Sequence, residues 1–153
     1  MTRKTPLALM LTLALAGLAP AAFAACSIEL EGNDAMKFNL ANIDVSKKCT
    51  TFEVKLRHTG KMARNVMGHN VVVSRTADMA AINADGIKAG LATEYVKPGD
   101  ARVIAHSKVI GGGESTSFVI PVGKLNAANG PYSFFCSFPG HAALMKGTVT
   151  LKP

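Results

Sequence analysis

The sequence of 153 residues has no tryptophan, no internal repeat and no linker or low-complexity tract, so a single domain accounts for it most simply. It also lacks a long apolar run. The longest, residues 7–18, extends over about 12 residues, short of the roughly 20 that a membrane-spanning helix needs. We therefore expect no membrane span.

A basic run interleaved with aromatic residues, common in nucleic-acid-binding proteins, is absent as well. The lysines are scattered, as at Lys37, Lys55, Lys88, Lys108, Lys124 and Lys146. The formal net charge is +7, and it falls to +5 if Arg3 and Lys4 are removed with the N-terminal segment. This pattern predicts a moderately basic, solvated surface and no nucleic-acid partner.

The first 24 residues have the features of a secretory signal peptide. Arg3 and Lys4 form its positive end, residues 7–18 form its apolar stretch, and Ala22-Phe23-Ala24 ends its small-residue tail. We expect cleavage after Ala24, which leaves residues 25–153 as one exported domain. The predicted location is periplasmic.

Cysteine is scarce and odd in number, which needs an explanation in an exported protein. The simplest partition pairs Cys26 with Cys49 in an oxidising compartment and leaves Cys136 free. The alternative is that Cys26 is the lipid-bearing first residue of a lipoprotein. Phe23 fits that alternative poorly, and lipidation would leave Cys49 without a partner.

Short stretches of alternating apolar and polar residues predict an all-β domain. The clearest stretch is 51–58, in which Phe52, Val54 and Leu56 share one face. Further strands are expected at residues 27–30, 36–40, 66–73, 102–106, 117–122, 131–136 and 147–152, with a turn at 31–34. About seven or eight strands at this spacing are typical of an antiparallel sandwich or barrel.

Residues 74–91 differ from this pattern, because Met79, Ile82 and Ile87 fall loosely at helical spacing. They predict a short helical insertion between strands. Ser74 or Thr76 is its expected cap, and a glycine at position 90 is its expected stop.

The residues with distinctive chemistry gather between Cys136 and Met145, with His141 between them. Pro139-Gly140 prevents a continuous helix here, so the chain must loop and can wrap around one point. A thiolate, an imidazole and a thioether form a soft donor set that suits copper better than magnesium or calcium.

A second imidazole, at His69, would complete this set. Two imidazoles and one thiolate with a weak axial thioether define a blue-copper electron-transfer site. A cysteine nucleophile activated by His141 is a rival, but it leaves Met145 and His69 unexplained. A zinc site is another, although a thioether is a poor zinc ligand. A copper storage or delivery module, the remaining alternative, would be expected to show several Met or His clusters.

Residues 65–70 (Asn-Val-Met-Gly-His-Asn) and 134–147 (Phe-Phe-Cys-Ser-Phe-Pro-Gly-His-Ala-Ala-Leu-Met-Lys-Gly) resemble the azurin family of bacterial cupredoxins. The resemblance covers essentially the whole chain after residue 24 and implies an eight-stranded Greek-key β-sandwich. It implies one copper ion bound by His69, Cys136, His141 and axial Met145, with the Gly68 carbonyl as a weak opposite contact. Val71 departs from the family, in which many members have a core tryptophan.

The resemblance also implies roles around the metal. Asn70 is expected to hydrogen-bond the loop that carries Cys136, and a backbone amide near Phe138 to donate to the sulfur. His58 and His106 are not expected to bind copper. An apolar patch around His141 should receive redox partners: Met67, Phe138, Pro139, Gly140, Ala143 and Leu144. The resemblance implies a monomeric electron carrier and not an enzyme. It implies c-type cytochromes or a nitrite reductase as the partners.

Overall fold

The computed structural model describes Met1 and residues 25–153. The predicted signal peptide and its cleavage after Ala24 fall on residues 2–24, which lie outside the described part of the chain. No helix of the described part is long and apolar enough to cross a membrane.

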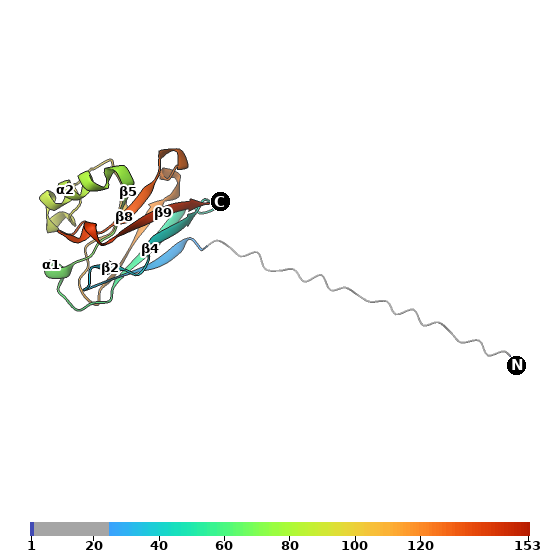
Figure 1. Cartoon of the computed structure of the whole chain (residues 1–153), viewed down its shortest axis with the longest axis horizontal. Helices are drawn as coiled ribbons and strands as arrows, with labels where there is room; N and C mark the ends of the chain where they lie inside the picture. The colour runs from blue at the N-terminus through green and yellow to red at the C-terminus, as the bar shows by residue number, and fades with distance from the viewer. Residues whose placement is uncertain (2–24) are drawn as a thin grey trace.

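Nine strands in the described chain form two sheets that pack as a sandwich (Figure 1). One sheet has the order β2 (Lys37–Phe38), β1 (Ser27–Asn33), β4 (Thr51–His58), β7 (Ser115–Pro121). The other has the order β3 (Asn42–Ser46), β9 (Lys146–Lys152), β8 (Tyr132–Phe135), β5 (Val72–Arg75), β6 (Val103–His106). The β1·β4 and β3·β9 pairs are parallel, and the others are antiparallel.

The predicted all-β Greek-key sandwich is thereby confirmed, and the sheets do not close into a barrel. The two-residue β2 raises the strand number above the expected eight. The cysteine pairing is confirmed too, because a disulfide joins Cys26 to Cys49 and Cys136 is free. This bond rules out the lipid-bearing Cys26. It closes a loop of the size that contributes about 3 kcal/mol in the chain-entropy description.

Alternation along β4 explains how the sandwich is filled. Phe52, Val54 and Leu56 point into the core and are almost completely buried, while Lys55 and Arg57 lie exposed on the other face. Burial of such side chains stabilises the fold by about 1.5–3 kcal/mol each. The core they join contains aliphatic side chains and phenylalanine, with Val71 fully buried among them.

The continuous strand predicted over residues 66–73 is wrong. The chain forms a short helix, α1 (Arg64–Met67), and then passes His69 as an isolated bridge to Ile110 before β5 begins. Gly68 lies at the break, where only glycine fits, because a Cβ would come within 2.2 Å of the Arg64 carbonyl. The apolar residues at 66–67 and 71–73 therefore belong to two segments with different neighbours.

Other strand boundaries also differ. β1 continues through Gly32 and Asn33, where a turn was expected, because Gly32 and Asn33 pair with β2. The expected strand at 36–40 shrinks to β2, and β3 was missed although Ile43 and Val45 alternate inward. β3 is short and pairs with β9 from the far end of the chain, so local pattern gives little sign of it.

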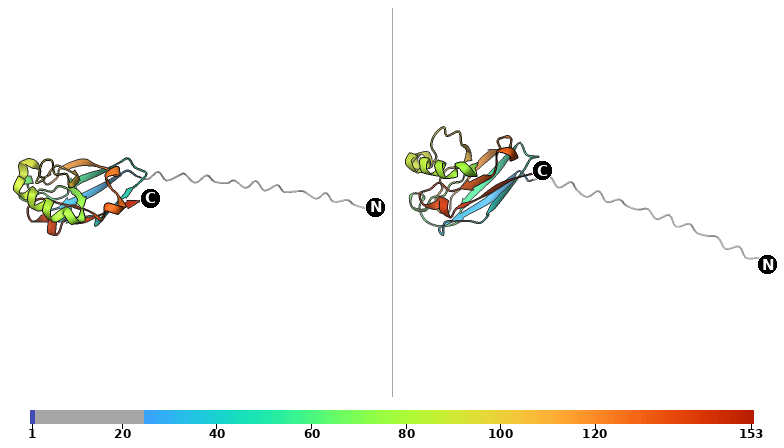
Figure 2. Two further views of the ribbon diagram at one scale, coloured as in Figure 1. Left: turned by 90° about the horizontal axis from the view of Figure 1, so that it is seen from above. Right: turned by 45° about the horizontal axis from the view of Figure 1, so that its top comes forward.

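The helical insertion is confirmed as α2 (Met79–Ala89), preceded by a 3₁₀ turn at Thr76–Asp78. Neither predicted cap is correct. The Ser74 hydroxyl donates to the Arg75 carbonyl and the Thr76 hydroxyl pairs with Ser133, so neither is available to the helix. Gly90 does end the helix, with φ 84° and ψ 178°, a combination that is almost confined to glycine. Figures 1 and 2 show α2 at the end of the sandwich far from the C-terminus.

An arginine ties the insertion to the chain that follows it. The Arg102 guanidinium contacts Asp85 of α2 at 2.6 Å and Asp100 at 2.5 Å. Hydrogen bonds from Arg102 lower the pKa of both carboxyl groups below their usual value of 3.8. The insertion is thus held by charge as well as by its contacts with the sheets.

We expect Arg102→Gln to lower the free energy of unfolding at pH 7 and to lose part of that effect in acid. A carboxylate whose folded pKa is depressed contributes stability above its unfolded pKa, and this is lost as pH falls through the folded pKa. The difference from wild type should therefore shrink below pH 3.8. Urea unfolding at neutral pH and in acid measures it. Arg57→Gln, which breaks an exposed pair with Glu31, is the control. A difference for Arg102→Gln that stays constant with pH would contradict the assignment.

Candidate metal centre

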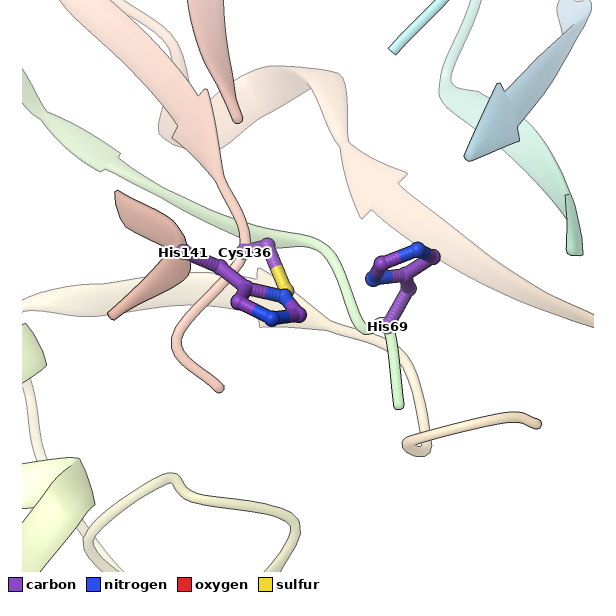
Figure 3. Close-up of side chains that lie close together, drawn as sticks. All are labelled: His69, Cys136 and His141. Carbon is purple, nitrogen blue, oxygen red and sulfur yellow. The ribbon is translucent and has the colours of Figure 1, made fainter. Parts of the chain in front are cut away.

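Three side chains from separate turns meet at the end of the sandwich that carries α1. Cys136 follows β8, His141 begins a 3₁₀ turn (His141–Ala143), and His69 precedes β5. One nitrogen of each histidine and the Cys136 sulfur all lie within 4.8 Å of one another. Figure 3 shows the sulfur and the two rings facing a common point. All three residues are buried, as metal ligands in a water-excluded site would be.

Hydrogen bonds at its base hold the loop from Cys136 to Met145. The Cys136 amide donates to the Met145 carbonyl at 2.9 Å, which continues the β8·β9 pairing and joins the two ends of the loop. Gly140 reverses the chain with φ 83°, and the amide of Met145 then donates to the His141 carbonyl. His141 Nδ1 thereby comes to 3.6 Å from the Cys136 sulfur.

His69 reaches the same point from the other side. Its amide and carbonyl pair with Ile110, and its Nε2 donates to the Asn33 carbonyl at 2.9 Å. That bond places the ring proton on Nε2 and leaves a lone pair on Nδ1. Nδ1 is buried and has no hydrogen-bond partner among the described residues. A buried polar atom without a partner is costly, so this nitrogen fits a metal ligand.

The electrostatics agree with a site that holds neutral imidazoles. Burial is the main cause that lowers the pKa of His69 to about 4, and it also lowers the pKa of His141. Burial raises the pKa of the Cys136 thiol to about 12, although the backbone amides of Asn70 and Phe138 hydrogen-bond the sulfur and act in the opposite direction. A bound metal ion would supply the charge that keeps this sulfur a thiolate.

The predicted axial groups lie on the same cluster. Met145 is fully buried and packs with Cys136, Val109 and Phe138. The Gly68 carbonyl is 4.0 Å from the Cys136 sulfur. These contacts show where Met145 and the Gly68 carbonyl lie, and their bonding to a metal stays a prediction.

Asn70 contacts the ligand loop as expected. Its Oδ1 accepts from the Ser137 amide and its Nδ2 donates to the Ser137 hydroxyl, both at 2.8 Å. Sequence reasoning missed the partners Ser137, Asn33 and Gly32. A Cβ on Gly32 would lie 2.8 Å from the His69 ring. No local pattern marks Asn33 and Gly32, because they come from another segment and contribute through a carbonyl or by the lack of a side chain. Ser137 lies beside Cys136, but its partner Asn70 is distant in sequence.

Two further histidines lie outside the donor group. His58 stacks on His69 with ring centroids 4.2 Å apart, but its Nδ1 accepts from the Gly60 amide and its Nε2 donates to the Met67 carbonyl. Both nitrogens are thus engaged. His106 is exposed on β6, away from the three donors.

The predicted apolar patch is exposed in part. Leu144 is 64% exposed, and Pro139, Gly140 and Ala143 are exposed beside it. Phe138 departs from the expectation, because it is only 7% exposed and packs against Tyr95 and the His141 ring. Phe138 therefore lies beneath the exposed patch and is not part of its surface. Val66 and Met62, which sequence reasoning left out, are also exposed.

The model of copper-binding proteins of the plastocyanin/azurin family matches residues 24–152. Azurin from Bordetella pertussis is 58% identical over 133 residues, which cover 87% of this chain and 88% of that protein. This chain belongs to the azurin family. Azurin from Pseudomonas fluorescens biotype B is 55% identical over 129 residues, 84% of this chain and all of that protein.

The solved structure of an azurin (Az-iso2) from Methylomonas sp. strain J matches with a TM-score of 0.81 and 38% identity. The match covers 85% of this chain and 100% of that one. The resemblance to azurins is confirmed, and so is copper as the cofactor, because the buried His69, Cys136 and His141 form a donor set that suits this metal.

We expect Gly68→Ala to destabilise the metal-free protein by about 1–3 kcal/mol, as overpacking does. The added methyl would meet the Arg64 carbonyl at 2.2 Å and Val109 at 2.5 Å. Gly123→Ala is the matched control, since a Cβ there meets nothing within 4 Å, and it should stay within about 0.5 kcal/mol. Urea unfolding gives the free energy of unfolding of the two metal-free variants. Equal values would show that the neighbours of Gly68 move aside for a methyl group at little cost.

Proposed function

We propose that this chain is a periplasmic electron carrier that passes single electrons through one copper ion. His69, Cys136 and His141 would be its main ligands, and Met145 and the Gly68 carbonyl would be weaker, axial contacts. The observation that carries the proposal is the buried Nδ1 of His69, which has no hydrogen-bond partner in the described part of the chain and faces the Cys136 sulfur and the His141 ring. When bound, copper supplies a centre that alternates between Cu(II) and Cu(I).

The protein's part in this function is to hold the ligands still. Asn70 fixes the residue after Cys136, and the Cys136 amide is bonded to the Met145 carbonyl. His69 is held at its backbone by Ile110 and at its ring by Asn33. Ligands held in this way keep one arrangement in both oxidation states, so little reorganisation opposes electron transfer. Burial of the three donors excludes water from the site.

The state of Cys136 supports a carrier over a cysteine enzyme. A catalytic cysteine needs a lowered pKa and access to substrate, whereas burial raises the pKa of this thiol to about 12. The alternative of a copper storage or delivery module would use donors that a partner can reach. Here the three donors are covered.

Export follows from the predicted signal peptide at residues 1–24, with residues 25–153 as a single monomeric domain. The Cys26–Cys49 disulfide supports an oxidising compartment such as the periplasm. Exposed Leu144 and its neighbours provide a small apolar surface close to His141, of the kind that supports brief encounters. We propose c-type cytochromes or a nitrite reductase as the redox partners.

The copper-loaded, oxidised protein should be intensely blue from thiolate-to-Cu(II) charge transfer. Cys136→Ser should abolish the colour because it removes the sulfur, whereas Met145→Leu should keep the colour and shift the reduction potential. Visible absorption and voltammetry measure the two effects. A pale wild-type complex would refute electron transfer by this site, and equal loss of colour in both variants would refute the axial role.

Leu144→Glu should slow electron transfer with a reduced c-type cytochrome by about five-fold or more, as loss of a contact worth about 1 kcal/mol would. Val119→Glu is the matched control, because Val119 is also exposed (49%) but lies on β7, opposite Glu53. Both variants change the net charge equally, so the comparison isolates the location. Stopped-flow mixing gives the rates, and equal slowing would place docking elsewhere.

A further inference from the structure

Glu94 has an unusual backbone conformation in the chain between α2 and β6. It follows the 3₁₀ turn Leu91–Thr93, and both Glu94 (φ 61°) and Tyr95 (φ 52°) are in the left-handed region. Residues with a side chain adopt this conformation reluctantly, and it persists where the surrounding structure holds it. Two such residues in succession indicate that specific contacts fix this turn.

The Glu94 carboxylate makes those contacts outside its own segment. Its Oε2 accepts from Arg64 Nη2 at 2.7 Å and from the Val109 amide at 2.6 Å. Arg64 Nε in turn donates to the Val109 carbonyl at 2.8 Å. The three residues therefore form a closed ring that links α1, the chain between α2 and β6, and the chain between β6 and β7.

The Glu94 main chain contacts the ligand segments through Asn70. The Glu94 carbonyl accepts from Asn70 Nδ2 at 2.7 Å, and the same nitrogen donates to the Ser137 hydroxyl. A flipped amide would turn its oxygen toward the Glu94 carbonyl, which cannot donate. The carbonyl thus selects the orientation in which Asn70 Oδ1 accepts the Ser137 amide, next to Cys136.

Val109 gives the ring a second route to the site. Its side chain packs with Cys136, Phe138 and Met145. The next residue, Ile110, pairs through its backbone with His69. By holding the Val109 amide, the Glu94 carboxylate therefore holds the Val109 side chain beside the Cys136 sulfur. It also holds Ile110, whose backbone supports His69.

We propose that Glu94, together with Arg64, is a positioning residue of the copper site, which sets the ligand segments on either side of the metal at a fixed separation. It hydrogen-bonds Asn70 and Val109, and it acts through them on the three ligand side chains that Figure 3 shows. This role rests on the proposed function, because it concerns the same copper site. It assigns part of the site's rigidity to an ion pair at the base of the insertion.

The first test uses the metal-free protein, so that it does not depend on copper chemistry. In Glu94→Ala, hydrogen exchange of the Val109 and Ser137 amides, followed by NMR, should be about ten-fold faster or more, as expected for the loss of hydrogen bonds to a charged group. Glu94→Gln keeps one acceptor oxygen and should be intermediate. Asp85→Asn is the matched control, since Asp85 also pairs with an arginine in the insertion and is similarly exposed. It should leave both amides at the wild-type rate.

The second test asks for an effect that simple destabilisation would not give. In the copper-loaded protein, Glu94→Ala should shift the charge-transfer band and the copper hyperfine splitting in EPR, while Asp85→Asn leaves both unchanged. If Glu94→Ala does not fold, Glu94→Gln is compared instead. Wild-type exchange rates and spectra in the Glu94 variant would overturn the proposal. A wild-type protein without blue colour would refute the proposed function, and the exchange data would still decide the role of Glu94.

Discussion

The structure depends on one constraint, the burial of three donor atoms around a common point where they can meet a metal. His69 Nδ1 has no hydrogen-bond partner among the described residues, and the Cys136 sulfur lies in an environment that opposes its ionisation. Left alone, such a cluster would rearrange to satisfy its polar atoms. It persists because hydrogen bonds to Asn33, Ile110 and Asn70 already hold the ligand segments in place, which opposes such a rearrangement.

The sandwich provides that engagement from both of its sheets. Asn33 at the end of β1 holds the His69 ring, and the β8·β9 pairing closes the ligand loop. Segments outside the sheets add the rest, through Ile110 and the contacts of Asn70. The site is thus assembled from distant parts of the chain, and its rigidity comes from hydrogen bonds between them more than from any single element.

This division explains what could be predicted from sequence. Cys136, His141 and Met145 lie on one loop with a Pro-Gly turn, so their spacing alone indicated a soft metal, and alternation predicted β4 correctly. Gly32, Asn33 and Glu94 could not be found in this way, because they act through backbone groups or across sheets. The prediction of one strand over residues 66–73 failed for a related reason. The apolar residues on either side of Gly68 belong to a helix and to a strand, which pack against different neighbours. The local sequence pattern is thus enough to predict the ligand side chains of the loop. The residues that hold the ligands in place become visible only in the tertiary structure.

The parallel β3·β9 pair has a consequence for the order of folding. β9 is the last strand in the chain, yet it lies between β3 and β8 in its sheet. That sheet is incomplete until β9 is available, and pairings between such distant segments form slowly because a long loop must close first. A chain of this topology stays unfolded during its synthesis for longer than one built from neighbouring hairpins. The ligand loop joins β8 to β9, so the metal-binding end takes its final form only after β9 has paired within its sheet.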